Sequence, residues 1–254
     1  MSAPDSIDAD SPWLGLASFT EQTRALFFGR EQEVAELERR VQRKLLGPAG
    51  HGTEVSISAV RAVSAANMAY ERDDFATAGR IARDAVAQLQ AARHSVAPQN
   101  RNYVWSILQE ALFAIEGHAE YHLGDFAAAA QAERMALQAV SADASNYAQR
   151  TTWLSMALAR EGKRTEAAQT IAPVVTMYRA LEKRNHGDQW VPLEFAAALY
   201  AQALTDPSHR ASLLREAAER VDHLIPAIAR LHDTREWRAR IEAAQRAPDG
   251  QAAQ

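Results

Sequence analysis

The residues whose type and arrangement most clearly suit binding or catalysis form a glycine-rich segment, GPAGHGTE, in the N-terminal quarter of the chain. Gly47 and Gly52, with Gly50 between them, have the glycine spacing of a phosphate-binding loop, Gly-x4-Gly-Lys-Ser/Thr. In such a loop the backbone amides cradle the phosphates, the lysine neutralises them and the hydroxyl holds Mg²⁺. Thr53 stands where the lysine belongs, and Glu54 stands where the hydroxyl belongs. Because a carboxylate repels phosphate, the segment favours a glycine linker over a working nucleotide site.

Two histidines with helical spacing are the other candidates for chemistry. His118 and His122 are four positions apart, which puts both imidazoles on one face of a helix, as in many zinc sites. Glu120 follows the first histidine by two positions, so the His-Glu-x-x-His pattern is not met. The chain has no cysteine, and its serines lack a Gly-x-Ser-x-Gly elbow. We therefore predict no catalytic residue, no metal and no cofactor.

Helices must position these residues, because the chain is rich in alanine and poor in β-branched runs. Residues 111–140 show the clearest pattern, with apolar side chains at helical spacing on both sides of a polar turn. Gly124 is expected to end the first helix, and Asp125 can accept hydrogen bonds from the free amides of the next. Gly117 supplies a small residue where a neighbouring helix can approach closely. This stretch predicts a pair of antiparallel helices.

Weaker copies of this pair occur before and after it. The turns at Asp73, Gly124 and Gly162 are 51 and 38 residues apart. Small residues at matching positions after the turns are Ala78 and Ala85 in the first copy, Ala129 and Ala136 in the second, and Ala167 in the third. The Gly-Asp-aromatic turn followed by these alanines resembles a tetratricopeptide (TPR) unit, whose usual period is about 34 residues. The resemblance implies a stack of helix pairs.

The predicted fold class is all-α, a TPR-like right-handed helical solenoid with a short N-terminal helical or irregular extension. The expected parts are a disordered leader at 1–12, an N-terminal segment with a glycine linker at 13–53, helical repeats at 54–246 and a frayed tail at 247–254. A last helix, from Thr234 to Arg246, is expected to cover the apolar end of the stack with Trp237 and Ile241. The expected helices span 55–71, 75–92, 101–122, 126–140, 151–160, 165–183, 190–204, 208–224 and 234–246.

The N-terminal segment differs from the helical remainder. The runs GLASF at 15–19 and LFFGRE at 26–31 resemble the opening of the novel STAND NTPase modules of bacterial signalling and conflict proteins. In that family the Gly-Arg-Glu turn lies near the nucleotide base and precedes the phosphate-binding loop. The resemblance implies an alternative interpretation, in which Gly29, Arg30 and the glycines Gly47, Gly50 and Gly52 bind a nucleotide.

The C-terminal half resembles another group of proteins. Runs such as REGK at 160–163 and LHDTREWR at 231–238 are similar to helical-repeat tails of multidomain bacterial signalling proteins. This resemblance implies a sensing or docking role, and it leaves open that the chain is the remnant of a larger STAND or kinase/cyclase-type protein.

The composition of the chain limits the kinds of partner that we expect it to bind. The formal charge of −4 and the pI near 6.1 give no general attraction to nucleic acid. No apolar run reaches 18 residues, and the acidic start lacks the features of a signal peptide. We therefore predict a cytoplasmic protein that binds neither nucleic acid nor membrane. The sequence does not rank monomer above dimer.

Binding is the function that the helical pattern favours. In a TPR solenoid the first helix of each pair lines a concave surface that takes up a peptide. Trp105 is either an apolar anchor on that surface or a residue packed between helices. Arginines at positions 93, 101, 150 and 160 suggest a basic groove and hence an acidic partner. The predicted partner-binding residues are Asn67, Asn102, Tyr103, Trp105, Asn146, Tyr147 and Arg150.

The main functional prediction is therefore a non-catalytic scaffold, and not an enzyme, that binds a partner protein or peptide in bacterial signalling or conflict response. The alternative is a nucleotide-responsive regulator that retains weak NTP binding at the degenerate phosphate loop. Retained binding is more plausible than turnover, since hydrolysis needs the missing lysine or another cation and ligands for Mg²⁺.

Overall fold

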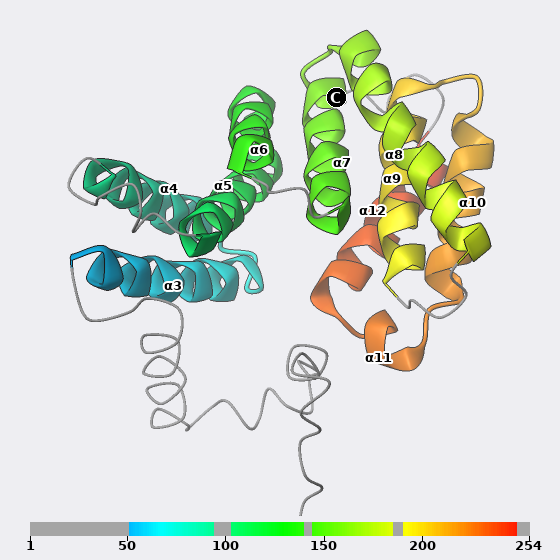
Figure 1. Cartoon of the computed structure of the whole chain (residues 1–254). Coiled ribbons are helices and arrows are strands. Elements are labelled where there is room, and N and C mark those ends of the chain that lie inside the picture. Colours follow the sequence, from blue (N-terminus) through cyan, green and yellow to red (C-terminus); the bar gives the residue numbers. More distant parts are fainter. Residues whose placement is uncertain (1–50, 94–102, 140–143, 185–189, 248–254) are drawn as a thin grey trace, which may run out of the picture.

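The structure, a computed structural model, describes residues 51–93, 103–139, 144–184 and 190–247 (Figure 1). Within these ranges the secondary structure is helical and contains no strand, which confirms the all-α prediction for this part of the chain. The helices are α3 (His51–Tyr70), α4 (Phe75–Ala92), α5 (Tyr103–Leu123), α6 (Phe126–Ala139), α7 (Ala144–Arg160), α8 (Arg164–Arg184), α9 (Val191–Thr205), α10 (Arg210–Asp222), α11 (Pro226–Ala229) and α12 (His232–Arg246).

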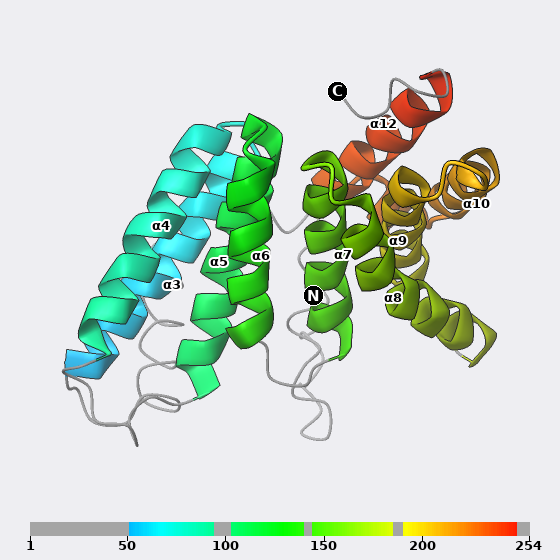
Figure 2. The same cartoon turned by 90° about the horizontal axis from the view of Figure 1, so that it is seen from above.

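Neighbouring helices form antiparallel pairs that stack one after another (Figure 2). The pairs are α3 with α4, α5 with α6, α7 with α8 and α9 with α10. The first helices of successive pairs also contact one another, from α3 to α5, α5 to α7 and α7 to α9. One side of the stack, here called the inner face, is therefore built from first helices. A stack of helix pairs is what the repeat pattern predicted, whereas the TPR identity and the right-handed superhelix stay predictions.

The turns inside the first three pairs have one geometry. Asp73, Gly124 and Gly162 each adopt a positive φ, of 60°, 86° and 89°. After each of them the next backbone amide bonds back to a carbonyl five residues earlier, which closes the helix in a Schellman-type turn. Asp74 and Asp125 then cap the following helix by accepting from the amides of Thr77 and Ala128. The predicted cap at Asp125 is confirmed, and the sequence repeat corresponds to a structural one.

The alanines at matching positions explain how closely the helices pack. Ala78, Ala129 and Ala167 are all buried, with at most 1% of their surface exposed. A buried alanine lets a second helix approach the backbone of the first, and larger side chains there would overpack the contact.

Two hydrophobic cores lie along the stack. One is formed by α3 to α6, and the other runs from the end of α5 to α12. The approach of α5 to α7 is looser than that of α3 to α5 or of α7 to α9. At this joint between the cores the inner face is lined by polar side chains.

Helix α12 follows the last pair and turns toward the inner face. It packs on α10 and α9, and its Trp237 contacts the rings of Trp153 on α7 and Tyr200 on α9. Trp237 and Ile241 are buried, as the expected capping helix requires. The helix does more than cover one end, since two of its polar residues reach back to α3 and α5.

Several expectations concern the chain's N-terminal part. Helix α3 begins at His51, four residues earlier than expected, so the end of the glycine segment is helical. The leader at 1–12, the runs at 15–19 and 26–31, and the residues Gly29, Arg30, Gly47 and Gly50 lie outside the described residues. In the part of the chain that is described, no helix has the length and apolar character needed to cross a bilayer.

Candidate functional site

Three of the predicted partner-binding residues lie around one cavity on the inner face. Asn67 of α3 and Asn146 and Arg150 of α7 line a hollow of about 260 Å³ at the joint between the two cores. Both asparagines are exposed, so their amides can donate and accept hydrogen bonds with a ligand. Its volume is below the roughly 300–1,000 Å³ of drug-sized sites, and suits a side chain of a partner. The other lining residues are Tyr70, Glu110, Ala111, Ala114, Ile115, His118, Gln149 and Asp233.

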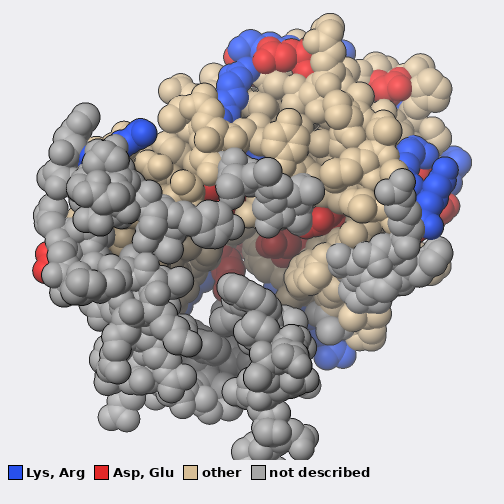
Figure 3. Space-filling view, in the orientation of Figure 1, with Lys and Arg blue, Asp and Glu red and all other residues tan. Residues whose placement is uncertain are grey.

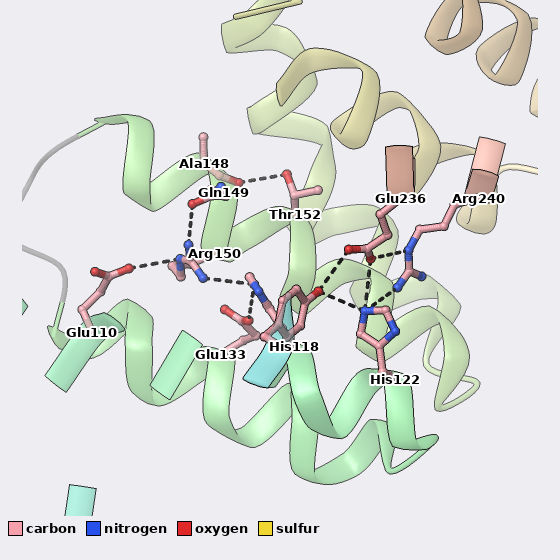
Figure 4. Close-up of polar contacts among 11 residues, drawn as sticks. Glu110, His118, His122, Glu133, Ala148, Gln149, Arg150, Thr152, Glu236 and Arg240 are labelled. Carbon is pink, nitrogen blue, oxygen red and sulfur yellow. Dashed lines mark hydrogen bonds and ion pairs between the residues drawn. The ribbon is translucent and has the colours of Figure 1, made fainter. Parts of the chain in front are cut away.

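Arg150 is the centre of a polar network in this cavity (Figure 4). Its Nε lies 3.1 Å from Glu110 Oε1, and the two side chains are only 8% and 9% exposed. Its guanidinium also contacts the side chain of Gln149 and lies 3.1 Å from His118 Nε2. Removing one partner of such a buried ion pair destabilises a protein by about 3–5 kcal/mol, because the other charge is left buried and unpaired. Arg150 therefore organises the floor of the cavity.

Glu133 of α6 reaches into the same network from behind. It is 1% exposed, its Oε1 lies 3.4 Å from His118 Nε2, and neither carboxyl oxygen makes a hydrogen bond within the described part of the chain. Gly117 of α5 makes room for this side chain, because a Cβ at that position would lie 2.8 Å from Glu133 Oε1. The close approach predicted at Gly117 is thus real, and what approaches is a carboxyl group.

Burial decides the protonation of this pair. Desolvation, helped by Glu110 and opposed by Arg150, raises the pKa of Glu133 to about 8. Desolvation and the charge of Arg150 hold the pKa of His118 well below its usual value. At neutral pH the contact therefore joins a protonated carboxyl and a neutral imidazole, and it carries no net charge.

A second network ties α12 to the inner face. Arg240 Nε donates to Glu236 Oε1 at 2.8 Å, and Tyr70 of α3 donates to Glu236 Oε2 at 3.1 Å. His122 of α5 lies 3.1 Å from both Glu236 Oε1 and the Arg240 guanidinium. Its ring also stacks on Phe75 at 3.9 Å. Residues more than a hundred positions apart therefore meet here, and α3, α5 and α12 are joined through one carboxylate.

The charge of this second network is stable at neutral pH. Burial alone would raise the pKa of Glu236. The hydrogen bond from His122 and the charge of Arg240 outweigh burial and lower this pKa to about 2. The pKa of Arg240 is raised despite its burial, because Glu236 lies beside it. Burial and the nearby carboxylates also raise the pKa of Tyr70. Glu236 is therefore an ionised anchor between an arginine and a neutral phenol.

The charges in the two networks do not favour a bound metal ion. His118 and His122 share a helix face as predicted, but each has an arginine 3.1 Å from its Nε2, and a guanidinium there opposes a second cation. Ligand atoms of His232, Asp233 and Glu236 lie within 4.8 Å of one another. Glu236 is already bonded to Tyr70 and Arg240, so we assign no metal to this group.

The remaining predicted residues lie elsewhere. Trp105 is 4% exposed and donates to Ser56 Oγ at 2.9 Å, so of the two interpretations given for it the described structure has the one in which it packs between helices, here α5 and α3. Tyr147 is half exposed but lies outside the cavity lining. Tyr103 opens α5, and nothing beyond its backbone is described. Asn102 lies outside the described residues.

The described arginines of the predicted basic groove, Arg93, Arg150 and Arg160, do not line one common cavity. Arg150 is buried against Glu110, so its charge is not available to an acidic peptide. Arg160 lines a different cavity, and Arg101 lies outside the described residues. Figure 3 shows acidic and basic side chains interspersed around a largely uncharged face, without one large basic patch. The acidic partner therefore stays a prediction.

Sequence reasoning missed Glu133, Glu236 and Arg240 as members of the site. Glu133 and Glu236 lie on helices that carry other charged residues, and nothing in their spacing distinguishes them from solvated positions. Two residues in the sequence could have indicated them. Gly117 leaves room for the side chain of Glu133, and Trp237 marks the face of α12 that packs toward the inner face.

Comparison with protein-family models finds a match over more than half of the chain. Residues 12–154, more than half of the 254, match the family described as Novel STAND NTPase 1. The chain belongs to this family. Searches of curated proteins and of solved structures returned no match. The STAND resemblance seen in the N-terminal runs is thereby confirmed, and it extends about a hundred residues beyond the predicted boundary at 53.

The family corrects the functional prediction. A STAND NTPase module points to an NTPase, so the prediction that the protein is not an enzyme is wrong, and the non-catalytic TPR scaffold is not supported. The error came from giving the altered residues at Thr53 and Glu54 more weight than the resemblance of the whole N-terminal segment. The match covers α3 to α6 and most of α7, so the inner-face cavity is built largely from residues of the STAND family region.

Proposed function

We propose that this protein is a nucleotide-responsive signalling regulator of the STAND kind. Its N-terminal segment binds an NTP through Gly29, Arg30 and the glycines of the GPAGHGTE segment, and its helical stack presents the inner face to a partner protein. The observation that carries the proposal is the family match across residues 12–154, which spans both the glycine segment and the first helix pairs.

The start of α3 supports nucleotide binding. Residues 51–54, the end of the glycine segment, lie in α3, so the segment leads into a helix as a phosphate loop does. Free backbone amides and the helix dipole favour an anion at such a position. Glu54 in the first turn works against it. Absence of the lysine removes a charge-assisted hydrogen bond worth about 1.5–3 kcal/mol, which corresponds to binding roughly 10- to 150-fold weaker than in a complete loop.

The inner face supports the partner role. Asn67 and Asn146 come from helices of different pairs and present exposed amides to one cavity. The polar floor beneath them, Arg150 with Glu110, is held rigidly by burial. A peptide backbone laid across the face could therefore be bound by both amides, as in other helix-pair stacks. The partner is a protein or peptide, and its identity is open to experiment.

Nucleotide binding by the full chain tests the proposal. ATP or GTP with Mg²⁺ would be titrated by calorimetry, and phosphate release would be followed in parallel. We expect saturable binding that weakens in Arg30→Ala and persists in Arg40→Ala, a matched loss of one arginine in the same segment. Failure of both nucleotides to bind the wild-type chain would refute the proposal. Equal weakening in the two variants would show a general charge effect and remove Arg30 from the site.

A further inference from the structure

The start of α12 forms part of the wall of the inner-face cavity. Asp233, in the first turn of α12, lines this cavity together with residues of α3, α5 and α7. The neighbouring Thr234 is fully buried, and its hydroxyl donates to the carbonyl of Ile228, which holds the turn before α12 in place. The cavity is therefore bounded by four helices, and one of them follows the other three by some seventy residues or more.

Side chains, and not backbone packing, join α12 to α3 and α5. The Tyr70 hydroxyl donates to Glu236 Oε2 at 3.1 Å. His122 Nε2 lies 3.1 Å from Glu236 Oε1 (Figure 4). His232 Nε2 lies 3.6 Å from Oδ1 of Asp73, in the turn after α3. Within the described residues the backbone of α12 packs along α10 but not closely on α3 or α5. The contacts among these five residues are here called the clasp.

Tyr70 belongs both to the clasp and to the cavity. Its side chain lines the cavity, and its hydroxyl is the donor to Glu236. Its ring meets the rings of Phe75 and His122 edge-on, with centres 5.3 Å and 5.5 Å away. Because these rings hold Tyr70 in place, loss of its bond to Glu236 frees α12 and leaves Tyr70 where it is.

The two sides of α12 are attached by different kinds of contact. On the side of α7 and α9, Trp237 is buried against the rings of Trp153 and Tyr200. On the side of α3 the contacts are hydrogen bonds and ion pairs, which water can replace when they open. A small rotation of α12 about Trp237 can therefore open the clasp without exposing the apolar core, and it would remove the wall at Asp233.

The clasp also crosses the boundary of the family match. Tyr70, Asp73 and His122 lie inside residues 12–154, whereas His232 and Glu236 lie outside them. The STAND region is therefore in direct contact with a helix that the match does not include, and its cavity takes one wall from that helix.

We propose that the clasp controls the inner-face cavity. When Glu236 is bonded to Tyr70, α12 closes the cavity on its fourth side, and when this contact is released the cavity opens. Occupancy of the closed cavity and docking of α12 then favour one another, because the same tyrosine takes part in both. This regulation rests on the proposed function only in taking the inner face as the site of the partner. Its test needs neither nucleotide nor partner, so its failure is distinguishable from failure of the nucleotide titration.

Thiol protection in the full chain tests the clasp. Because the chain has no cysteine, Ala114→Cys places a single thiol in the cavity lining, at a position that is 4% exposed. The bulky thiol reagent DTNB reaches it only when the cavity opens, so the reaction rate measures the open population. Ala85→Cys is the control, since this position is 5% exposed in the core of α3 to α6 and lies outside the cavity lining.

Tyr70→Phe removes the donor to Glu236 and keeps the ring. We expect it to raise the reaction rate at Ala114→Cys by about tenfold or more, the equivalent of one lost charge-assisted hydrogen bond, and to leave Ala85→Cys unchanged. Hydrogen exchange in the first turns of α12 should become faster in the same variant, while α9 stays protected. Tyr147→Phe, at a half-exposed tyrosine outside the cavity lining, should leave the reaction rate unchanged.

Asp73→Asn tests the outer contact of the clasp. Its effect on the reaction rate should stay below about fivefold, because the Asp73 side chain is exposed, and asparagine tolerates the positive φ of this turn. An effect larger than that of Tyr70→Phe would remove Tyr70 from the centre of the clasp and overturn the proposal.

The remaining outcomes that would overturn the proposal concern the position of the thiol. Rapid reaction of Ala114→Cys in the otherwise wild-type chain would show that the cavity is already open. A rate that Tyr70→Phe leaves unchanged would exclude control by the clasp, and an equal rise at Ala85→Cys would indicate loosening of the whole core. Faster exchange of α12 without faster reaction at Ala114→Cys would show that the clasp holds the helix but does not close the cavity.

Discussion

Glu133 gives the sharpest quantitative prediction. Its carboxyl group is fully buried between Gly117 and His118, and burial raises its pKa from 4.5 to about 8. The folded protein therefore holds the proton more tightly than the unfolded chain does. Between pH 4.5 and 8 the folded state binds more protons, so the free energy of unfolding must fall as the pH rises.

The magnitude follows from these pKa values. Each unit of difference is worth about 1.4 kcal/mol, so Glu133 removes at most about 5 kcal/mol of stability between pH 4.5 and pH 8 or above. Glu133→Gln keeps the shape and cannot ionise. We expect the stability of this variant relative to wild type to increase by about 1.4 kcal/mol per pH unit through that range, and to become constant above it.

Urea unfolding followed by circular dichroism at several pH values measures this difference. His118 acts in the opposite direction, because its pKa is lowered in the folded state and its contribution rises with pH, but it is present in both proteins. Glu166→Gln removes a half-exposed carboxylate that pairs with Arg134, and its difference curve should be nearly flat. A falling curve for Glu133→Gln would mean that Glu133 is ionised against Arg150, and the reasoning from burial would be wrong.

Further predictions concern the turns and the attachment of α12. Gly124→Ala and Gly162→Ala should each lower the free energy of unfolding, measured with urea, by about 1 kcal/mol. The positive φ is the only source of strain, since the added Cβ meets nothing within 4 Å. An unchanged urea midpoint would show that the positive φ does not strain an alanine there. Gly117→Ala should destabilise by about 1–3 kcal/mol, since the carboxyl of Glu133 must move; the double change with Glu133→Ala should recover part of that loss. Glu236→Gln should weaken the attachment of α12 by about 2–3 kcal/mol and speed its hydrogen exchange. Because the pKa of Glu236 is about 2, the same loss should appear in wild type only as the pH falls below about 4.5 toward 2. If the hydrogen-exchange protection of α12 is equal in wild type and in Glu236→Gln at neutral pH, the carboxylate of Glu236 does not anchor this helix.

The parts of the fold that the sequence predicted are those set by local interactions. A positive φ at Gly124 followed by a capping Asp125 needs only a few neighbouring residues, and the same pattern recurs around Asp73. The burial of Ala129 follows from its position after such a turn. Asn67 and Asn146 line one cavity because α3 and α7, the first helices of the first and third pairs, both contact α5.

The parts that the sequence did not predict depend on contacts between distant residues. Helix α12 carries many charged residues, so Glu236 and Arg240 look like solvated positions until Tyr70 and His122 are placed beside them. Burial of Trp105 depends on Ser56, a residue 49 positions away. The extent of the STAND region was missed for another reason. Its helical part has no motif with a chemical role, and only a family comparison detects it.

The central claim is that the glycine segment, which runs into the start of α3, is a weakened phosphate loop. Calorimetric titration of Mg²⁺-ATP into wild type and into Thr53→Lys/Glu54→Ser tests it directly, because the double change restores Gly-x4-Gly-Lys-Ser. Ser64→Lys/Glu71→Ser makes the same change of charge farther along α3 and in the turn that follows it, and serves as the control. We predict saturable binding to wild type, at least about tenfold tighter binding to the repaired loop and no gain in the control. No binding to wild type and no gain on repair would contradict a nucleotide site in this segment.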